Sequence, residues 1–329
     1  MRIALIGSGS IAAAHARAIR RIAESDVVLA PRVVVVVGRQ QAGAEQFARD
    51  HGIDRATAEF ERACESAEID AAIVCSPSSV HAAQSRRALL AGKHVLCEIP
   101  VALSLAEADA LAALAAARGL TLMVCHTQRY YPALVEARRL IADGEIHPHA
   151  LIARYGFLRR ENVNWLGRRR TWTDDLIWHH GGHAVDTALW LLGQSVETVR
   201  ALIAQRDEPL GIPLDYGILL RTVRDQVVTI AMSYNTHIAV HDYLVVGEER
   251  SIQYVDGDLR DASGILVPRA RSGSVSDPIV EQDRDFLHAA RGERACPLGV
   301  GDIRPSLEAL QILQGEFDRR GAVRHPRYP

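Results

Sequence analysis

Lysine is almost absent from this chain, because Lys93 is the only lysine among its 38 basic side chains. A reaction that needs a primary amine, such as Schiff-base formation, would therefore depend on that one residue. The formal net charge of −2 predicts no general attraction to nucleic acid or to an anionic membrane surface. No apolar run approaches the roughly 20 residues of a membrane-spanning helix, so no membrane partner is expected.

Cysteine is also scarce, and its spacing argues against the common paired frameworks. The five cysteines are odd in number and show no paired metal-binding spacing, which indicates reduced thiols in a cytoplasmic protein. The first residues lack the long apolar segment of a secretion signal. The rest of the composition is ordinary: 329 residues, 48% of them apolar, are enough for two domains of roughly 150 residues each.

The first recognisable motif is a glycine turn between a strand and a helix. Residues 2–6 are almost wholly apolar, and Gly7 and Gly9 precede a helical pattern in which Ala12 takes a position that requires a small side chain. Strand, turn and helix in this order form the dinucleotide fingerprint G-x-G-x-x-G/A, in which backbone N–H groups meet the pyrophosphate. We expect the cofactor's phosphates to contact Gly7, Ser8, Gly9, Ser10 and Ile11.

The end of the second strand, predicted over 33–37, indicates which cofactor is bound. Sites specific for NAD place a carboxylate there, where it accepts hydrogen bonds from the adenosine ribose. Here Gly38 and Arg39 follow the strand, without an acidic residue. A guanidinium at this position suits a 2′-phosphate, so NADP is the predicted cofactor; the alternative is an ordinary solvated arginine.

Further strands are predicted at 71–75, 94–97 and 121–125, separated by helices. This alternation predicts an α/β fold, a doubly wound parallel sheet, in an NADP-binding Rossmann domain over residues 1–125. Such sheets bind ligands at the carboxyl ends of their strands. The residues expected to contact the cofactor there are Cys75, Ser76, His81 and Glu98. Arg129 follows the last strand at the same edge and is a candidate ligand for a substrate carboxylate.

The sequence pattern changes after residue 125. Six segments, the first over 150–158 and the last over 251–255, alternate between apolar and polar residues like half-exposed antiparallel strands. Helices are predicted near the end of the chain, at 279–290 and 304–319. We therefore expect an α+β substrate-binding domain over residues 126–329, built on a large, mostly antiparallel open sheet.

The second half contains three histidines in a stretch of five residues: His179, His180 and His183. Asp186 follows three residues later. Histidine titrates near neutrality, so such a cluster suggests proton transfer or a metal. His179, His183 and Asp186 share one face if the helix is continuous there, although the glycines indicate that it begins near Gly182. The alternatives are a buried polar network, or a zinc site that uses the same three residues.

These motifs resemble the Gfo/Idh/MocA family of NAD(P)-dependent oxidoreductases. The residues that carry the resemblance are Gly7 to Gly9 with His15, Ser76-Pro77 with His81, Glu98-Ile99-Pro100, Arg129 with Pro132, and His183 with Asp186. The resemblance implies a Rossmann domain and a second domain whose sheet often forms the dimer face, hence a homodimer or higher homo-oligomer. It also implies that Ile99 replaces the lysine that usually binds the reacting hydroxyl. Lys93 precedes its strand, at the opposite edge of the sheet, and is not a substitute.

A narrower resemblance within this family covers residues 157–162, 170–174 and 176–183. These stretches are similar to a branch that oxidises the cyclic hemiacetal of an aromatic ring-cleavage product to a lactone, with NADP as hydride acceptor. The resemblance implies a role in aromatic compound catabolism and a small, anionic cyclic substrate, since planar guanidinium groups suit carboxylates. The substrate-binding residues that we expect are Arg129, from its place at the ligand edge, and Arg160; His180 is either structural or in contact with the substrate, and the resemblance alone adds Asn162 and Trp172.

Hemiacetal oxidation needs hydride loss from carbon and proton loss from the hydroxyl group. We expect His179 or His183 to be the base, with Asp186 orienting His183, because Ile99 cannot transfer a proton. A metal is not expected, since the nicotinamide already accepts the hydride. Two alternatives are an oxidoreductase of the same family acting on a sugar, an inositol or another cyclic alcohol, and a non-catalytic regulator that senses NADP.

Overall fold

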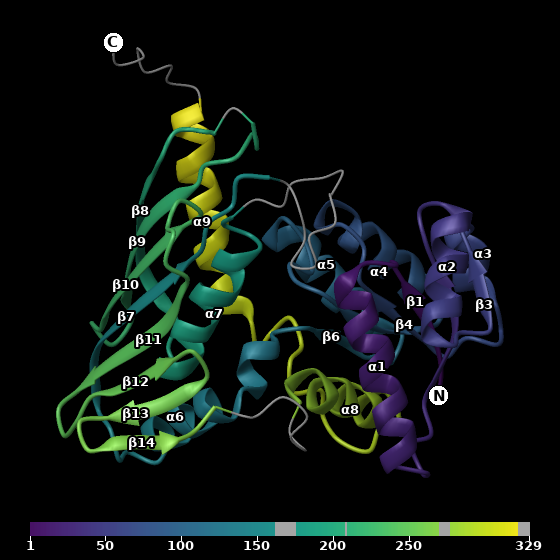
Figure 1. The fold of residues 1–329 in the computed structure, drawn as a ribbon, viewed down its shortest axis with the longest axis horizontal. Helices are drawn as coiled ribbons and strands as arrows, with labels where there is room; N and C mark the ends of the chain where they lie inside the picture. The colour runs from purple at the N-terminus through teal and green to yellow at the C-terminus, as the bar shows by residue number, and fades with distance from the viewer. Residues whose placement is uncertain (162–175, 208, 270–276, 322–329) are drawn as a thin grey trace. The chain divides into compact units, whose positions relative to one another are not determined.

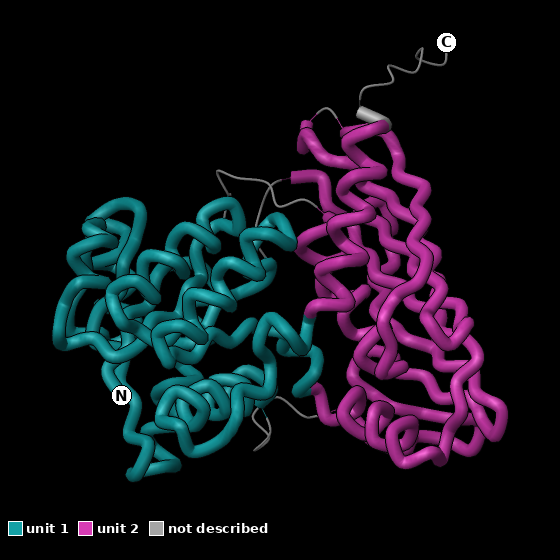
Figure 2. Tube along the Cα trace, turned by 180° about the vertical axis from the view of Figure 1, so that it is seen from behind, with its two compact units in different colours: residues 1–130, 164–168, 273–303 teal, residues 131–163, 169–272, 304–329 magenta. Residues whose placement is uncertain are grey.

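The structure, a computed structural model, describes residues 1–161, 176–207, 209–269 and 277–321. These residues form two compact units, which Figure 2 shows in different colours. Unit 1 contains residues 1–130 and 277–303, and unit 2 contains the other described residues. The chain therefore leaves the first unit after Tyr130 rather than at residue 125, and it returns to that unit for a segment that the sequence assigned to the second domain.

A six-stranded parallel sheet forms the centre of unit 1, in the order β3-β2-β1-β4-β5-β6 (Figure 1). Its strands are β1 (Arg2–Ile6), β2 (Arg32–Val37), β3 (Arg55–Thr57), β4 (Ala71–Val74), β5 (His94–Cys97) and β6 (Leu122–Val124). Ile3 and Leu5 on β1 and Ile73 on β4 are fully buried, as residues of a parallel sheet covered on both faces should be. The predicted doubly wound sheet is confirmed.

The helices of unit 1 join these strands and include one from much later in the chain. They are α1 (Ser10–Ser25), α2 (Gln41–His51), α3 (Phe60–Glu65), α4 (His81–Leu90), α5 (Leu105–Ala117) and α8 (Pro278–Ala290), with the short 3-10 turns η1 (Ser78–Val80) and η2 (Thr127–Tyr130). Helix α8 packs on α1 and η2. Asp277 caps α8 by accepting a hydrogen bond from the N–H of Ile279, and it also pairs with Arg21 of α1 at 3.0 Å. These contacts explain why α8 belongs to unit 1.

Unit 2 is built on an eight-stranded sheet in the order β14-β13-β12-β11-β7-β10-β9-β8. Its strands are β7 (Pro148–Gly156), β8 (Val196–Ile203), β9 (Asp215–Thr222), β10 (Val227–Ser233), β11 (Val240–Gly247), β12 (Ile252–Val255), β13 (Asp258–Asp261) and β14 (Gly264–Val267). β7 pairs with β10 in parallel and with β11 in antiparallel orientation. The mostly antiparallel sheet is confirmed, while β13 and β14 were not predicted because neither sequence alternates between apolar and polar residues.

Helices cover one face of this sheet and leave the other exposed (Figure 1). They are α6 (Pro132–Ala142), α7 (His180–Leu192) and α9 (Arg304–Gly321). On the uncovered face, Ile152 is 43% exposed, Leu219 53% and Leu202 71%. Among the described helices of either unit, none is both long enough and apolar enough to cross a membrane.

Candidate active site

The glycine turn after β1 has the backbone that the fingerprint requires. Gly7 has a φ of +120°, and a Cβ there would lie 2.6 Å from the carbonyl oxygen of Cys75, so no other residue fits. A Cβ on Gly9 would meet nothing within 4 Å, which leaves open space beside the N-terminus of α1. Ala12 is fully buried where the helix packs on the sheet. The turn from Gly7 through Ser8, Gly9 and Ser10 to Ile11 therefore fits a pyrophosphate.

Arg39 lies at the end of β2, as the sequence predicted. It is exposed and follows Gly38, at which a Cβ would lie 2.9 Å from the Cβ of Ala44 on α2. The tight approach at Gly38 brings the start of α2 close to the strand end. No acidic residue stands between Val37 and Gln41, so a guanidinium is the charged group at this corner of the sheet.

His81 joins the loops that follow β4 and β5. Its Nδ1 lies 2.8 Å from the carbonyl oxygen of Pro100, and its Nε2 lies 2.7 Å from that of Ser76. Carbonyl oxygens only accept hydrogen bonds, so both contacts require a proton on each ring nitrogen. Burial alone would lower the pKa of His81, but Cys97 and the two carbonyl groups raise it to about 9. His81 therefore holds two loops of the predicted cofactor edge in place, and its ring nitrogens are already used.

His15, on α1, has no exposed surface and bridges two carboxylates. Its Nδ1 lies 2.9 and 2.8 Å from the two oxygens of Asp283 on α8, and its Nε2 lies 3.0 Å from Oε1 of Glu98. Burial alone would lower the pKa of His15, but the charge of Asp283 and hydrogen bonds to both carboxylates raise it to about 10. The other oxygen of Glu98 accepts a hydrogen bond from the N–H of Ile99 at 3.3 Å. Glu98 is thus fixed in orientation directly after β5.

Buried thiols surround this bridge. Cys75 and Cys125 follow β4 and β6, and burial raises the pKa of both well above the ordinary value for a thiol. Ligand atoms of His15, Glu98 and Cys125 lie within 4.8 Å of one another, the separation that a metal site would need. We assign the group to an ion pair instead, because carboxylates engage both ring nitrogens of His15 and the thiol stays protonated.

Position 99 and the only lysine behave as the sequence predicted. Ile99 is 5% exposed and has no group that can exchange a proton. Lys93 is 7% exposed, and its Nζ donates hydrogen bonds to the carbonyl oxygens of Ser66 at 2.9 Å and Ile69 at 2.8 Å. It precedes β5, whereas the glycine turn and Glu98 follow their strands. The lysine is therefore at the opposite end of the parallel sheet from the predicted cofactor edge.

Arg129 lies in η2, which α8 holds in place. Its Nη2 donates to the carbonyl oxygen of Asp302 at 3.1 Å. Thr127 donates to Gln282 at 3.0 Å, and the hydroxyl of Tyr130 donates to a carboxylate oxygen of α8 at 3.1 Å. These contacts explain how a loop after the last Rossmann strand keeps a defined shape.

In unit 2, the histidine cluster (His179, His180 and His183) lies at the start of α7. The helix begins at His180, two residues before the Gly182 start that the sequence suggested, and His179 is its N-cap. Gly181 makes the early start possible: its N–H donates to the carbonyl oxygen of Leu176 at 2.8 Å, and a Cβ there would lie 3.1 Å from that oxygen. His183 and Asp186 are therefore both in the helix, three residues apart. His183 lies about one turn after the N-cap residue His179.

Asp186 and Trp178 tie the start of α7 to α9. Asp186 is 1% exposed and accepts a hydrogen bond of 2.8 Å from the hydroxyl of Ser306. The indole N–H of Trp178 donates to Gln314 at 2.8 Å. Asp186 thus has a partner besides any that His183 provides, and Trp178 belongs to the packing between helices.

His180 lies among aromatic side chains of unit 2. Its ring stacks on Tyr155 with centroids 4.8 Å apart, and Phe157 meets it edge-on at 5.5 Å. Its Nδ1 is hydrogen-bonded to the hydroxyl of Tyr234. Tyr155 also faces His241 across the β7–β11 pair, with ring centroids 4.9 Å apart. Burial lowers the pKa of His241 to about 4, so this histidine is neutral at physiological pH.

Two arginines stand beside this aromatic group. The guanidinium of Arg159 lies 5.2 Å from the ring centroid of Tyr234, within cation–π range, and Arg159 is 6% exposed. Arg160 is exposed and donates a hydrogen bond of 2.6 Å to Asn235. The predicted substrate ligands Asn162 and Trp172 lie outside the described residues.

Several residues of both regions were not found by sequence reasoning. Asp283 sits in a helix 268 positions from His15, and only the return of α8 to unit 1 brings them together. Tyr155 and His241 lie in β7 and β11, and Tyr234 directly follows β10; the alternation of these strands could be predicted, but their pairing could not. A period-two pattern does predict that Tyr155 and Phe157 share a face, and that signal was available.

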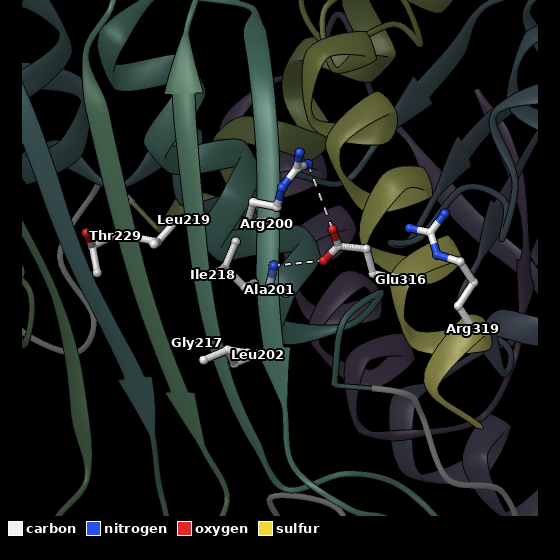
Figure 3. A pocket seen from close by; sticks show the side chains of 9 residues that line it. All are labelled: Arg200, Ala201, Leu202, Gly217, Ile218, Leu219, Thr229, Glu316 and Arg319. Carbon is white, nitrogen blue, oxygen red and sulfur yellow. Dashed lines mark hydrogen bonds and ion pairs between the residues drawn. The ribbon is translucent and has the colours of Figure 1, made fainter. Parts of the chain in front are cut away.

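A separate cavity of about 540 Å³ lies over β8 and β9 beside the C-terminal part of α9 (Figure 3). Glu316 points toward β8, where it accepts a hydrogen bond of 2.8 Å from the N–H of Ala201 and pairs with Arg200 at 4.0 Å. Leu202 and Leu219 bring the cavity to the exposed face of the sheet. Among the described residues that line it there is no histidine, and the carboxylate of Glu316 is held by Ala201 and Arg200.

Comparisons with known proteins cover both halves of the chain. Residues 1–126 match the Gfo/Idh/MocA profile, described as "Oxidoreductase family, NAD-binding Rossmann fold", and residues 132–258 match "Bacterial oxidoreductases, C-terminal". The chain is 30% identical to 4-carboxy-2-hydroxymuconate-6-semialdehyde dehydrogenase of Sphingobium sp. (strain NBRC 103272 / SYK-6), over 98% of this chain and 100% of that one. It is 28% identical to inositol 2-dehydrogenase of Rhizobium meliloti (strain 1021), over 73% of each.

Solved structures show the same fold at lower identity. A levoglucosan dehydrogenase in complex with NADH and L-sorbose has a TM-score of 0.82 at 19% identity, covering 97% of each chain. A UDP-N-acetylglucosamine 3-dehydrogenase from Acidithiobacillus ferrooxidans has a TM-score of 0.78 at 24% identity, covering 95% of this chain and 96% of its own.

Proposed function

The chain belongs to the Gfo/Idh/MocA family of NAD(P)-dependent oxidoreductases, and we propose that it oxidises the cyclic hemiacetal of 4-carboxy-2-hydroxymuconate-6-semialdehyde to 2-pyrone-4,6-dicarboxylate. This reaction belongs to the 4,5-cleavage route of protocatechuate breakdown. The observation that carries the proposal has two parts. Ile99 is buried at the position where the family usually has a lysine, and three histidines lie at the start of α7, where they can replace that lysine in proton transfer. The full-length similarity to a dehydrogenase of that semialdehyde supports the choice of substrate.

The oxidation transfers hydride from the hemiacetal carbon to the nicotinamide and removes the proton of the hydroxyl group. When bound, the cofactor supplies the hydride acceptor. His179 or His183 takes the proton, and Asp186, held by Ser306, fixes the helix turn on which His183 stands. His180 is held by Tyr234 and by stacking, which suits a residue that contacts the substrate rather than one that accepts its proton.

The substrate of this reaction is a planar dicarboxylate. Guanidinium groups bind carboxylates bidentately. We assign Arg129 and Arg160 as the arginines that bind the two carboxylates of the substrate. The aromatic surface of Tyr155, Phe157 and Tyr234 supports a flat ring as the ligand of unit 2. Asn162 and Trp172 complete the proposed set.

We propose NADP as the preferred cofactor, because Arg39 is the charged residue at the end of β2 and no carboxylate stands beside it. A 2′-phosphate gains a charge-assisted hydrogen bond there, whereas the ribose hydroxyl of NAD lacks its usual acceptor. The comparison of NADP with NAD in one assay tests this choice independently of the substrate.

We also propose that the chain forms a homodimer or higher homo-oligomer through the uncovered face of the eight-stranded sheet. Ile152, Leu202 and Leu219 expose apolar surface there, in addition to the cavity beside α9. Light scattering after size-exclusion chromatography is expected to give a multiple of 36.0 kDa for the wild type and a monomer for Leu219→Arg. A wild-type monomer at micromolar concentration would contradict the proposal.

The substrate assignment is tested with a panel. The purified protein is supplied with NADP and, in separate reactions, the 4,5-cleavage product of protocatechuate, myo-inositol, glucose and xylose, while NADPH formation is followed by absorbance. We expect NADPH only with the cleavage product, and a lactone dicarboxylate as the product in mass spectrometry. Turnover of a sugar or an inositol at a higher kcat/KM would show that the substrate is a different cyclic alcohol.

A further inference from the structure

Strand β7 presents its side chains alternately to the two faces of the eight-stranded sheet. Leu151 and Ala153 are 0% and 1% exposed on the face that the helices cover, whereas Ile152 is 43% exposed on the other face. Side chains two residues apart share a face of a strand, so Tyr155 belongs to the covered face. Helix α7 packs on this face over β7 and β10 (Figure 1). Tyr155 therefore faces the helix that begins at His180.

Two contacts of different kinds fix the ring of His180. The hydrogen bond between its Nδ1 and the hydroxyl of Tyr234 holds one point on the edge of the ring. The torsion that turns a histidine ring about its bond to Cβ has only broad minima, so a contact with the face of the ring is needed to define its plane. Tyr155 supplies that contact, because the two rings stack with centroids 4.8 Å apart and planes 26° from parallel.

The ring of Tyr155 is held in turn by its neighbours on the sheet. His241 is its cross-strand partner on β11, with ring centroids 4.9 Å apart, and Phe157 meets Tyr155 edge-on at 6.3 Å. Burial lowers the pKa of His241 to about 4 and raises that of Tyr155 to about 12, so both rings are uncharged near neutral pH. Tyr155 is therefore a neutral ring whose position is set by the sheet.

We propose that Tyr155 is a positioning residue for substrate binding: its ring fixes the plane of the His180 imidazole, which contacts the substrate. The inference rests on the proposed contact between His180 and the substrate, and it does not depend on which cyclic substrate is oxidised. Without the ring of Tyr155, His180 stays tethered to Tyr234 but can turn about that tether. Substrate binding is then weakened more than the rate at which bound substrate reacts.

Two substitutions separate the ring of Tyr155 from its hydroxyl group. Tyr155→Leu removes the stack and should raise KM about 3- to 10-fold, the contribution of one aromatic pair, with a much smaller change in kcat. Tyr155→Phe keeps the stack and should restore KM to the wild-type value. Steady-state assays of NADPH formation measure both constants. An equal rise in KM in both variants would show that the hydroxyl group is responsible, and it would overturn the proposal.

A double-mutant cycle tests whether Tyr155 acts through His180 or touches the substrate itself. His180→Ala removes the ring that the stack positions, so the addition of Tyr155→Leu to this variant should raise KM no further. A further rise of the size that Tyr155→Leu causes alone would overturn the proposal and leave the role of His180 intact. If His180→Ala alone leaves KM at the wild-type value, the proposed contact of His180 with the substrate is itself wrong.

Tyr254→Leu is the matched control, because it removes a tyrosine ring from the same sheet. Tyr254 is 4% exposed, and among the described residues its ring contacts are those with Tyr131, His241 and Tyr243. It should lower the thermal midpoint at least as much as Tyr155→Leu, since Tyr254 is the more buried of the two, and leave KM unchanged. A rise in KM equal to that of Tyr155→Leu would assign the effect to general loosening of the sheet and overturn the proposal.

The stack can also be measured without a substrate, by NMR of the full-length protein. The ring of Tyr155 shields the carbon-bound protons of the His180 imidazole, so their signals should move downfield in Tyr155→Leu and stay in place in Tyr155→Phe. In the wild type, cross-relaxation between the protons of the two rings is expected. Its absence would overturn the proposal even if Tyr155→Leu does not fold. Lack of turnover of the proposed hemiacetal leaves these signals unaffected, so the two failures are distinguishable.

Discussion

His15 and His81 in unit 1 are 0% and 2% exposed, and each of their ring nitrogens lies within hydrogen-bond distance of an oxygen, of a carboxyl group for His15 and of a backbone carbonyl for His81. The histidine cluster at the start of α7 in unit 2 is half-buried instead, and the ring of His180 contacts those of Tyr155 and His179. The same side chain is thus a fixed cation in one region, and in the other it is the side chain that we propose takes up the proton of the substrate.

The difference teaches that acceptor count, more than burial, decides what a histidine does here. His241 is half-buried and its Nε2 has no hydrogen-bond partner among the described residues, and burial lowers its pKa to about 4, which makes it neutral. Two acceptors reverse that outcome at His15, whose pKa rises to about 10. Substitutions of His15 or His81 should therefore lower the stability of the protein, whereas substitutions in the histidine cluster should lower kcat.

The largest expected effect is on catalysis in unit 2. Replacement of the base by alanine, in either His179→Ala or His183→Ala, should lower kcat by about 10²- to 10⁴-fold, the usual contribution of a positioned base. The Kd for NADP should stay close to that of the wild type, because the cofactor's fingerprint lies in unit 1. Stopped-flow assays of NADPH formation measure kcat, and near-wild-type turnover in both variants would contradict the assignment.

In unit 1 the expected effect is on stability. His15→Leu leaves Asp283 and Glu98 without their shared counter-charge in a buried position, which should lower the free energy of unfolding by about 3–5 kcal/mol. His147→Leu is a matched control, because His147 pairs with Glu249 while 64% exposed, and it should cost less than about 0.5 kcal/mol. Urea titrations followed by circular dichroism compare the two. Equal small losses would show that the bridge contributes little.

The pH dependence of stability should come from the same unit. The folded-state pKa of His81, about 9, exceeds the ordinary value of 6.5, so its stabilisation is complete below about pH 6.5 and is lost as the pH rises through 9. The loss is at most about 3 kcal/mol. His15 acts with the same sign at a slightly higher pH. Urea midpoints between pH 7 and 10 should fall for the wild type and fall less for His81→Gln; a flat wild-type profile would contradict the fixed-cation assignment.

The smallest of these effects concerns cofactor choice. Arg39→Ala should raise the Kd for NADP by about 10- to 100-fold, the equivalent of one charge-assisted hydrogen bond, and leave the Kd for NAD nearly unchanged. Arg49→Ala removes an arginine from the exposed side of α2, where it donates to Gln46, and should change neither constant. If Arg39→Ala weakens both cofactors equally, the guanidinium does not recognise the 2′-phosphate.

The two sheets and the position of the glycine turn could be predicted from the sequence, because they follow from patterns among neighbouring residues. The glycine turn, the valine strand and the period-two segments each depend on neighbouring residues only, and the two sheets follow from them. The contacts of His15 could not be predicted in that way. They depend on Asp283, which arrives through a chain return that no local pattern encodes, and on a pairing of loops after different strands.

The start of α7 shows the same limit on a smaller scale. Two glycines in a row usually weaken a helix, so the sequence placed its beginning near Gly182. The structure begins it at His180, because Gly181 packs against the carbonyl oxygen of Leu176, where a Cβ would be too close. A Cβ at position 181 would require the neighbouring chain to shift by a few tenths of an ångström, and tertiary packing outweighs the low helix propensity of glycine.

We propose that the histidine cluster of unit 2 transfers the proton of the substrate, whereas His15 and His81 of unit 1 carry a fixed charge and take no part in the transfer. Chemical rescue tests it most directly, with NADP and the 4,5-cleavage product of protocatechuate as substrates and free imidazole added at increasing concentration. Imidazole is expected to restore turnover to His179→Ala or His183→Ala, and to leave His81→Gln unchanged. Rescue of His81→Gln, or of neither alanine variant, would contradict the account.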